Sequence, residues 1–390
     1  MQSVNLPQPS DIEKQHSAQL QQQIAQQISQ AGGWISFAEY MQLALYAPGL
    51  GYYSAGLNKF GEAGDFITSP EVSPLFAHTL ARPVAALLKD LPAASLMEFG
   101  AGSGKLAADL LAELARTNSL PEKYFIVELS AELQQRQLVT LQQQVPELVE
   151  RVQWLSELPA QPEKLIVIAN EVLDAMPVTR FVIEQGKVNE LGVAVDNDEL
   201  VLATRAASES LRQQIEALAI PLEEDGIYTS EINLHIAPWI KALSDCIEQG
   251  AIYLIDYGYV RSEFYSPERH MGTFIGYYRH RAFDAPLWYP GLQDMTAFVD
   301  FTAVAEAALE NQLDVDGFTS QGNFLVNCGL ADVVENTPAK TEREHLQLVQ
   351  QMKTLSLPGE MGERFKVIGL SRGMQQNVPG FAMRDLRYSL

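Results

Sequence analysis

Between Ser95 and Asn170 the sequence alternates short apolar runs with longer amphipathic stretches, and this alternation limits the fold more than any other feature. The runs predict strands and the stretches predict helices, because their apolar residues recur at the spacing of each structure. The predicted strands cover 95–100, 123–129, 151–155 and 164–170, and the predicted helices cover 104–117 and 131–144. Strands and helices in this order form a mostly parallel sheet through right-handed crossovers. We therefore expect an α/β fold with helices on both faces of the sheet.

The alternation is interrupted between residues 179 and 249. Runs of period two, broken at Gln185-Gly186 and Asp196-Asn197, predict an inserted β-meander, and two helical stretches follow it. The apolar run 251–259 then returns to the sheet. The remaining expectations are a helix over 294–311 and closing strands over 312–319 and 365–371.

The first 92 residues are predicted to be mainly helical. Ile12, Leu20, Ile24 and Ile28 are separated by multiples of four, which predicts one apolar stripe on a helix over 10–30. Further helices are expected from 37, capped by Ser36 with Glu39, and over 71–89, with a long glycine-rich loop over 48–69 between them. The expected parts are N-terminal helices with a covering loop (1–92), a sheet-forming core (93–178 and 250–390) and an insertion (179–249).

Composition excludes several classes of partner and location. The net charge of −22 opposes binding to a phosphate backbone, so nucleic acid is not expected as a partner. No apolar run reaches the roughly 18 residues of a membrane span, and the N-terminus lacks the features of a signal or transit peptide. Cys246 and Cys328 have no neighbour at ligand spacing, so no metal is expected. The expectation is a soluble, cytoplasmic protein.

The segment MEFGAGSGKL, residues 97–106, places three glycines within five positions directly after an apolar run. A phosphate-binding P-loop is disfavoured, because Phe99 and Leu106 stand where that motif requires glycine and serine or threonine. The dinucleotide fingerprint G-x-G-x-x-G fails from Gly100, but its looser form ending in alanine is met from Gly102. Because the apolar run ends at Phe99, we place the turn at Gly100.

An E-x-G-x-G-x-G loop between a strand and a helix resembles the cofactor loop of class I S-adenosylmethionine-dependent methyltransferases. Glycines at 100 and 102 would let the backbone pass under the methionine and ribose, where a β-carbon would collide. Glu128 ends the next strand, where its carboxylate can accept hydrogen bonds from both ribose hydroxyls. A nicotinamide cofactor carries the same ribose, so an NAD(P)-dependent oxidoreductase stays open as an alternative. The glycines could also serve only close packing of strand and helix.

Asn170, Glu171 and Asp174 follow the predicted strand 164–170. Polar groups beyond the carboxyl ends of parallel strands face the ligand crevice, so these residues are candidates to meet a substrate. In amino-group methyltransferases a side-chain oxygen at this place orients the target nitrogen. The structural alternative is that Glu171 and Asp174 stabilise the N-terminus of the next helix.

The chain as a whole resembles the MidA-like proteins, whose mitochondrial members are complex I assembly factors that act as protein arginine methyltransferases. The similarity covers almost the whole chain, and its most specific blocks are GDFITSPE and ANEVLDAMP. It is also carried by YMQLALYAPGLGYYS, EFGAGSGKLAADLL, YFIVELSAELQQRQ, IYLIDYGY, GTFIGYYRHRAFDAPLWYPGLQDMTAFVDF and MGERFKVI. The resemblance implies a Rossmann-like class I methyltransferase fold, S-adenosyl-L-methionine as cofactor and a protein substrate, with a complex I subunit as the candidate by analogy.

The resemblance also implies site residues. The implied cofactor-binding residues are Glu98, Gly100, Ala101, Gly102, Gly104, Glu128, Leu129, Thr68, Pro70 and Asn170. The implied substrate-binding residues are Phe66, Tyr257, His280 and Asp294. A segment from Asp65 to Glu71 would cover the cofactor, although Thr68 and Ser69 could simply cap the helix that follows.

A guanidinium stays protonated in water, since its pKa lies above about 12, and it becomes a nucleophile only when carboxylates localise its charge. The acidic cluster and the family activity together predict that Glu171, Asp174 and Asp65 hold the guanidinium while Asn170 orients the attacking nitrogen. Thr179 and Phe298 stand where the family often has histidine, which puts the methyl acceptor in question. A non-catalytic assembly factor that retains the cofactor pocket is a further alternative, and the oligomeric state is not predicted.

Overall fold

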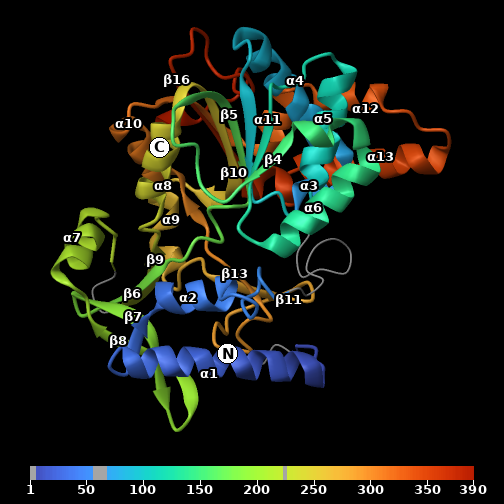
Figure 1. Cartoon of the computed structure of the whole chain (residues 1–390). Coiled ribbons are helices and arrows are strands. Elements are labelled where there is room, and N and C mark those ends of the chain that lie inside the picture. The colour runs from blue at the N-terminus through green and yellow to red at the C-terminus, as the bar shows by residue number, and fades with distance from the viewer. Residues whose placement is uncertain (1–5, 56–67, 223–225) are drawn as a thin grey trace. The chain divides into compact units, whose positions relative to one another are not determined.

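The structure is a computed structural model, and it describes residues 6–55, 68–222 and 226–390 (Figure 1). The chain forms two compact units, each assembled from three separate segments. Unit 1 consists of Met1–Phe66, Leu173–His235 and Tyr259–Asp300, and unit 2 consists of Ile67–Val172, Ile236–Gly258 and Phe301–Leu390. The N-terminal helices and the inserted meander therefore share a unit, whereas the sequence analysis assigned them to separate parts, 1–92 and 179–249.

Unit 2 contains the central sheet, with strands in the order β15-β16-β10-β5-β2-β3-β4. Their bounds are β2 (Ser95–Phe99), β3 (Tyr124–Val127), β4 (Val152–Leu155), β5 (Glu163–Asn170), β10 (Ile247–Tyr259), β15 (Asp314–Ser320) and β16 (Phe365–Arg372). The strands from β10 to β4 are parallel, and β16 is antiparallel to both β10 and β15. The expected mostly parallel sheet is confirmed. Chain order reverses between β2 and β5, which is the place where α/β sheets bind ligands.

Helices cover both faces of this sheet, as expected. On one side α4 (Pro74–Asp90), α5 (Lys105–Arg116) and α6 (Ala131–Gln144) pack in succession, and on the other side α8 (Ile236–Cys246) packs against α10 (Phe301–Glu310) (Figure 1). Residues 165–169 of β5 are all buried, as in a strand covered on both faces.

Several elements of unit 2 differ from the sequence expectations. The helix expected over 71–89 is divided into α3 (Ser69–Val72) and α4, because Ser73 precedes a proline and is extended. The helix expected over 294–311 begins only at Phe301. Between β15 and β16 the chain forms helices that the sequence analysis did not predict. They are α11 (Gln321–Asn327), α12 (Leu330–Asn336), α13 (Glu342–Ser356) and α14 (Met361–Arg364).

Unit 1 is built on an antiparallel sheet with the order β1-β7-β6-β9, to which β8 adds by pairing with β7. The bounds are β1 (Trp34–Ser36), β6 (Thr179–Glu184), β7 (Lys187–Asp196), β8 (Glu199–Ala206) and β9 (Ile227–Ile232). Its hairpins turn at Gln185-Gly186 and Asn197-Asp198, where all four residues have positive φ as in the turns that two-residue hairpins favour. The predicted meander is therefore present, with its second turn one residue later than expected.

Unit 1 contains several further helices and strands. They are α1 (Asp11–Gln30), α2 (Phe37–Tyr46), α7 (Glu209–Ala217), α9 (Arg261–Phe264), β11 (Ile275–Tyr278), β12 (Arg281–Phe283), β13 (Asp294–Thr296) and β14 (Val299–Asp300). Short 3₁₀ helices occur in both units at Pro146–Arg151, Pro267–Arg269 and Arg387–Ser389. Within the described ranges, no helix combines the length and apolarity that crossing a lipid bilayer requires.

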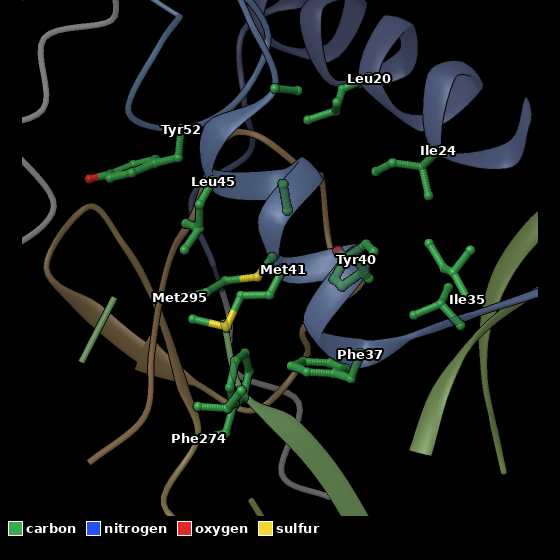
Figure 2. Close-up of a cluster of buried hydrophobic side chains, with 14 of the residues drawn as sticks. Leu20, Ile24, Ile35, Phe37, Tyr40, Met41, Leu45, Tyr52, Phe274 and Met295 are labelled. Atoms are coloured by element: carbon green, nitrogen blue, oxygen red, sulfur yellow. The ribbon is translucent and has the colours of Figure 1, made fainter. Parts of the chain in front are cut away.

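Side chains from α1, α2, β1 and the segment around β13 form the main apolar core of unit 1 (Figure 2). Leu20 and Ile24 of α1 lie in this core, and Tyr40 of α2 is fully buried with its hydroxyl donating to the Pro286 carbonyl at 2.6 Å. The predicted stripe of α1 is therefore confirmed for its last three members. Ile12 does not belong to it, because its side chain is 78% exposed.

Two of the three isoleucines of α1, Ile24 and Ile12, give a matched test of this packing. We expect Ile24→Ala to lower the free energy of unfolding by about 2–5 kcal/mol, because it leaves a cavity in a fully buried position. Ile12→Ala removes the same atoms from an exposed position and should change it by less than about 0.5 kcal/mol. Denaturant unfolding of both variants measures the difference, and equal effects would contradict the described packing of α1.

Candidate active site

The glycine-rich loop connects β2 to α5 in unit 2 and turns where the sequence predicted. Gly100 follows the last residue of β2, and its φ of +60° lies in the left-handed region that favours glycine. Gly104, with φ of +83°, directly precedes α5. A β-carbon on Gly104 would lie 2.9 Å from Cα of Gln137, so this glycine also permits the close approach of α6. The loop thus depends on glycine for its backbone conformation at one end and also for space at the other.

Glu98 lies inside the sheet just before this loop. Its side chain is buried, and one carboxylate oxygen accepts a hydrogen bond from the Tyr124 hydroxyl at 2.6 Å. Burial raises the pKa of Glu98 to about 7, against the opposing effect of that hydrogen bond. This carboxyl group therefore supports the strand end from within, and it changes charge close to neutral pH.

Glu128 follows β3 at the same edge of the sheet, as the sequence predicted. Its Oε1 accepts from the backbone N–H of Ser130 at 2.9 Å, and its Oε2 accepts from the side-chain amide of Gln137 at 3.1 Å. Burial raises its pKa, and the hydrogen bonds oppose that shift. The next residue, Leu129, is apolar and 78% exposed. An acid held at a strand end beside an exposed apolar residue suits a nucleoside, whose ribose is polar and whose base is flat and apolar.

Gln137 is a site residue that the sequence analysis missed. It is fully buried in α6, and besides Glu128 its Nε2 donates to the Gly102 carbonyl at 3.2 Å. The available signal was its position four residues before the buried Leu141, on the same face of the helix. Six glutamines occur among residues 134–144, so the sequence alone did not distinguish the buried one from the others.

Asn170 ends β5 and Glu171 follows it, beside the strand that carries the glycine loop. The backbone of Glu171 has φ of +55°, and its N–H donates to the Ile255 carbonyl at 2.8 Å. Its Oε1 accepts from the Asn170 side-chain amide at 2.9 Å and from the Ser69 N–H at 3.3 Å. The Oδ1 of Asn170 is buried with no hydrogen-bond partner among the described residues, so it can accept a bond from a bound molecule.

The segment from Thr68 to Glu71 contacts the glycine loop. Glu71 accepts a hydrogen bond from the Ser103 hydroxyl, and the Ser69 hydroxyl donates to Gln321 at 3.0 Å. Thr68 precedes α3 without a side-chain capping bond, and the cap of α4 comes from Ser73 instead. Pro70 is buried in α3. The contacts of this segment therefore favour attachment to the loop over capping, while Asp65 and Phe66 lie outside the described residues.

Asp174 and Asp294 belong to unit 1 and are both buried. The Tyr53 hydroxyl donates to Asp294 at 2.8 Å, and the ring of Tyr53 stacks on Tyr46 with centroids 5.4 Å apart. Burial is the largest cause that raises the pKa of Tyr53, and the charges of Asp294 and Asp174 raise it further. Unit 1 therefore places two carboxylates and a pair of aromatic rings together.

Two further residues predicted to bind substrate are Tyr257, which is buried, and His280, which is exposed. Tyr257 of β10 is buried in unit 2, and its ring meets Phe365 edge to face with centroids 5.3 Å apart. His280 of unit 1 is exposed in the turn between β11 and β12, where it and Arg279 both have positive φ. The position of His280 is accounted for by the hairpin turn, and its role in binding stays a prediction.

The described residues of unit 2 fit an S-adenosylmethionine-type ligand. A loop with left-handed glycines, a carboxylate at the next strand end and a buried amide oxygen of Asn170 without a partner all lie at the carboxyl edge of adjacent strands. Oxygen acceptors in such places match ribose hydroxyls and an amino group.

Comparison with known proteins agrees with this geometry. Mouse "Protein arginine methyltransferase NDUFAF7, mitochondrial" is 31% identical over 381 residues, which cover 87% of this chain and 81% of that protein. The bovine protein of the same name is 30% identical over 87% of this chain and 80% of its own length. Relatives from insect, mammal and nematode are all named as mitochondrial proteins, and this finding overturns the cytoplasmic location expected from the N-terminal sequence.

A crystal structure of a COG1565 superfamily member from Burkholderia thailandensis, bound to S-adenosyl-homocysteine, is 40% identical in sequence with a TM-score of 0.94. The similarity covers 99% of this chain and 100% of that one. Residues 79–319 match a family model described as "Putative S-adenosyl-L-methionine-dependent methyltransferase". These matches decide against the nicotinamide oxidoreductase alternative. The chain belongs to this family of S-adenosyl-L-methionine-dependent methyltransferases.

Proposed function

We propose that this methyltransferase transfers the methyl group to an arginine side chain of another protein. The named activity of the mouse and bovine relatives supports an arginine acceptor, and so do the acidic residues that follow β5. The conformation of Glu171 is the observation that carries the proposal. A φ of +55° is uncommon for a residue other than glycine, and backbone strain of this kind clusters at active sites.

Glu171 and Asn170 are the residues we assign to the acceptor nitrogen. When bound, S-adenosylmethionine supplies an electrophilic methyl group. Glu171 holds the guanidinium and localises its charge away from the attacking nitrogen, while Oδ1 of Asn170 accepts an N–H bond from that nitrogen and orients its lone pair. The acceptor nitrogen loses one proton to solvent when it gains the methyl group, and the rate acceleration comes mainly from positioning and electrostatics.

In unit 1 we assign Asp174 and Asp294 to binding of cationic groups of the substrate protein, and Asp65 is assigned by resemblance. The stacked rings of Tyr46 and Tyr53 beside these carboxylates support this assignment, since guanidinium groups bind both to carboxylates and to aromatic faces.

For the cofactor, Glu128 is assigned to the ribose and Leu129 to the base. A subunit of respiratory complex I is the first candidate substrate, by resemblance alone.

The acceptor can be identified directly. Purified protein is incubated with methyl-labelled S-adenosylmethionine and an extract of a strain that lacks the protein, and labelled peptides are sequenced by mass spectrometry. We expect label on arginine of one or a few proteins. Label on another residue type would contradict the arginine assignment, and absence of label from every protein would support the non-catalytic alternative.

A second experiment tests Glu171. We expect Glu171→Gln to lower the rate of methylation of a competent substrate at least about 100-fold, because the neutral amide cannot localise the guanidinium charge. Affinity for S-adenosyl-homocysteine should change less than about threefold, since the residue acts on the acceptor. Glu163→Gln, at the opposite end of β5, is the matched control and should leave both quantities unchanged. Normal methylation by Glu171→Gln would remove Glu171 from the mechanism.

The burial of Glu98 just before the glycine loop can be tested by measuring how the free energy of unfolding depends on pH. Its pKa rises from 4.5 to about 7 on burial, so the folded chain holds this proton more tightly than the unfolded chain. The contribution of Glu98 to the free energy of unfolding is fully present below its pKa in the unfolded chain. It is lost as pH rises through its pKa in the folded chain. Relative to Glu98→Gln, which does not titrate, the ligand-free wild type should lose about 3 kcal/mol of unfolding free energy between about pH 4.5 and pH 8.

Denaturant unfolding of the wild type and of Glu98→Gln at several pH values across this range measures the difference in their free energies of unfolding. Glu122→Gln, which changes an exposed acid before β3, should follow the wild type across the same range. A constant difference between wild type and Glu98→Gln would show that Glu98 does not titrate in this range.

A further inference from the structure

Gln137 connects three elements of unit 2 through one buried amide. Its Nε2 donates to the Glu128 carboxylate at 3.1 Å and to the Gly102 carbonyl at 3.2 Å, and its Oε1 accepts from the indole N–H of Trp154 at 2.9 Å. The side chain is fully buried in the middle of α6. A glutamine in such a position would weaken a helix interface unless its polar atoms had partners, and here each amide atom has at least one.

Trp154 fixes which way this amide points. An indole N–H can only donate a hydrogen bond, so it requires the oxygen of Gln137 on the side of β4. The NH₂ group must then face the end of β3 and the glycine loop, where the carboxylate of Glu128 and the carbonyl of Gly102 can only accept. The orientation of the amide is therefore determined by its partners.

The same stretch of α6 holds the loop by two further contacts. Thr140, one turn after Gln137, donates its hydroxyl to the Ser103 carbonyl at 2.7 Å. Gly104 lies so near Gln137 that a β-carbon on Gly104 would be 2.9 Å from the glutamine Cα. Residues 102–104 are thus docked on the helix that also orients Glu128.

We propose that Gln137 is a positioning residue that fixes the Glu128 carboxylate for the cofactor ribose and joins it to the glycine loop. The inference rests on the proposed assignment of Glu128 to the ribose. Gln137 itself acts through Glu128 and Gly102. One Glu128 oxygen is also held by the Ser130 N–H, so the amide of Gln137 is the side-chain contact that sets the second oxygen. Without the amide, that oxygen can rotate away from the ribose hydroxyls whose hydrogen bonds it should accept.

The test compares two ligands that differ by one hydroxyl, S-adenosyl-homocysteine and its 2′-deoxy analogue, by calorimetric binding to the ligand-free protein. Gln137→Met keeps the length of the side chain and removes its polar atoms. We expect it to weaken binding of S-adenosyl-homocysteine by roughly 10- to 100-fold and to weaken the deoxy analogue much less. The preference for the ribose hydroxyl should therefore shrink. A general structural defect would weaken both ligands equally and leave the preference unchanged, which would overturn the proposal.

Gln134→Met is the matched control. Gln134 lies on the same helix and its amide donates to Glu128 as well, but to the backbone carbonyl, at 2.7 Å. This variant should keep the wild-type preference between the two ligands. An equal loss of preference in both variants would contradict a specific role for Gln137.

Two more variants separate the possible failures. Trp154→Phe removes the N–H that orients the amide but keeps Gln137, so it should reduce the preference in the same direction even if Gln137→Met does not fold. Glu128→Ala tests the underlying assignment. If Glu128→Ala abolishes the preference and the Gln137 and Trp154 variants keep it, the positioning role of Gln137 is wrong but the assignment of Glu128 to the ribose stands. If Glu128→Ala also keeps the preference, the ribose assignment of Glu128 fails. Neither outcome depends on the identity of the methyl acceptor.

Discussion

Two adjacent parallel strands of unit 2 end in left-handed backbone, and the candidate site depends on this pair of turns. Gly100 after β2 has φ of +60° and Glu171 after β5 has φ of +55°. Chain order in the sheet reverses between these strands, so the segments that follow them diverge. Glycine makes the first turn without strain. The second turn is strained, and it is held by the bond from the Glu171 N–H to β10 and by the contacts of its carboxylate.

In the proposed mechanism the two turns serve different parts of the chemistry. The loop after Gly100 is docked on α6 and is joined to Glu128 through Gln137, an arrangement of backbone groups and one acid suited to a nucleoside. Glu171 is joined to Asn170 and to the short α3 segment, an arrangement of carboxylate and amide suited to a nitrogen nucleophile. If these assignments hold, we expect that substitutions can alter cofactor binding and acceptor binding separately.

Much of unit 2 could be predicted from sequence, because its strands and helices follow one another in local patterns. The turn at Gly100 and the position of Glu128 followed from where the apolar runs end. Pairings between distant segments were not predictable in this way: β1 pairs with β7, and Asp294 lies in a strand rather than in the expected helix. Gln137 was missed because its burial depends on Trp154 and Glu128, which no local pattern links to it.

The division of unit 1 among three segments affects how the chain can fold during synthesis. Leu20 and Ile24 of α1 share a core with Phe274 and Met295, which leave the ribosome some 250 residues later. Until then the apolar face of α1 lacks part of its covering, and contacts this distant in sequence slow folding. A nascent chain of this protein therefore exposes an apolar helix face for most of its translation.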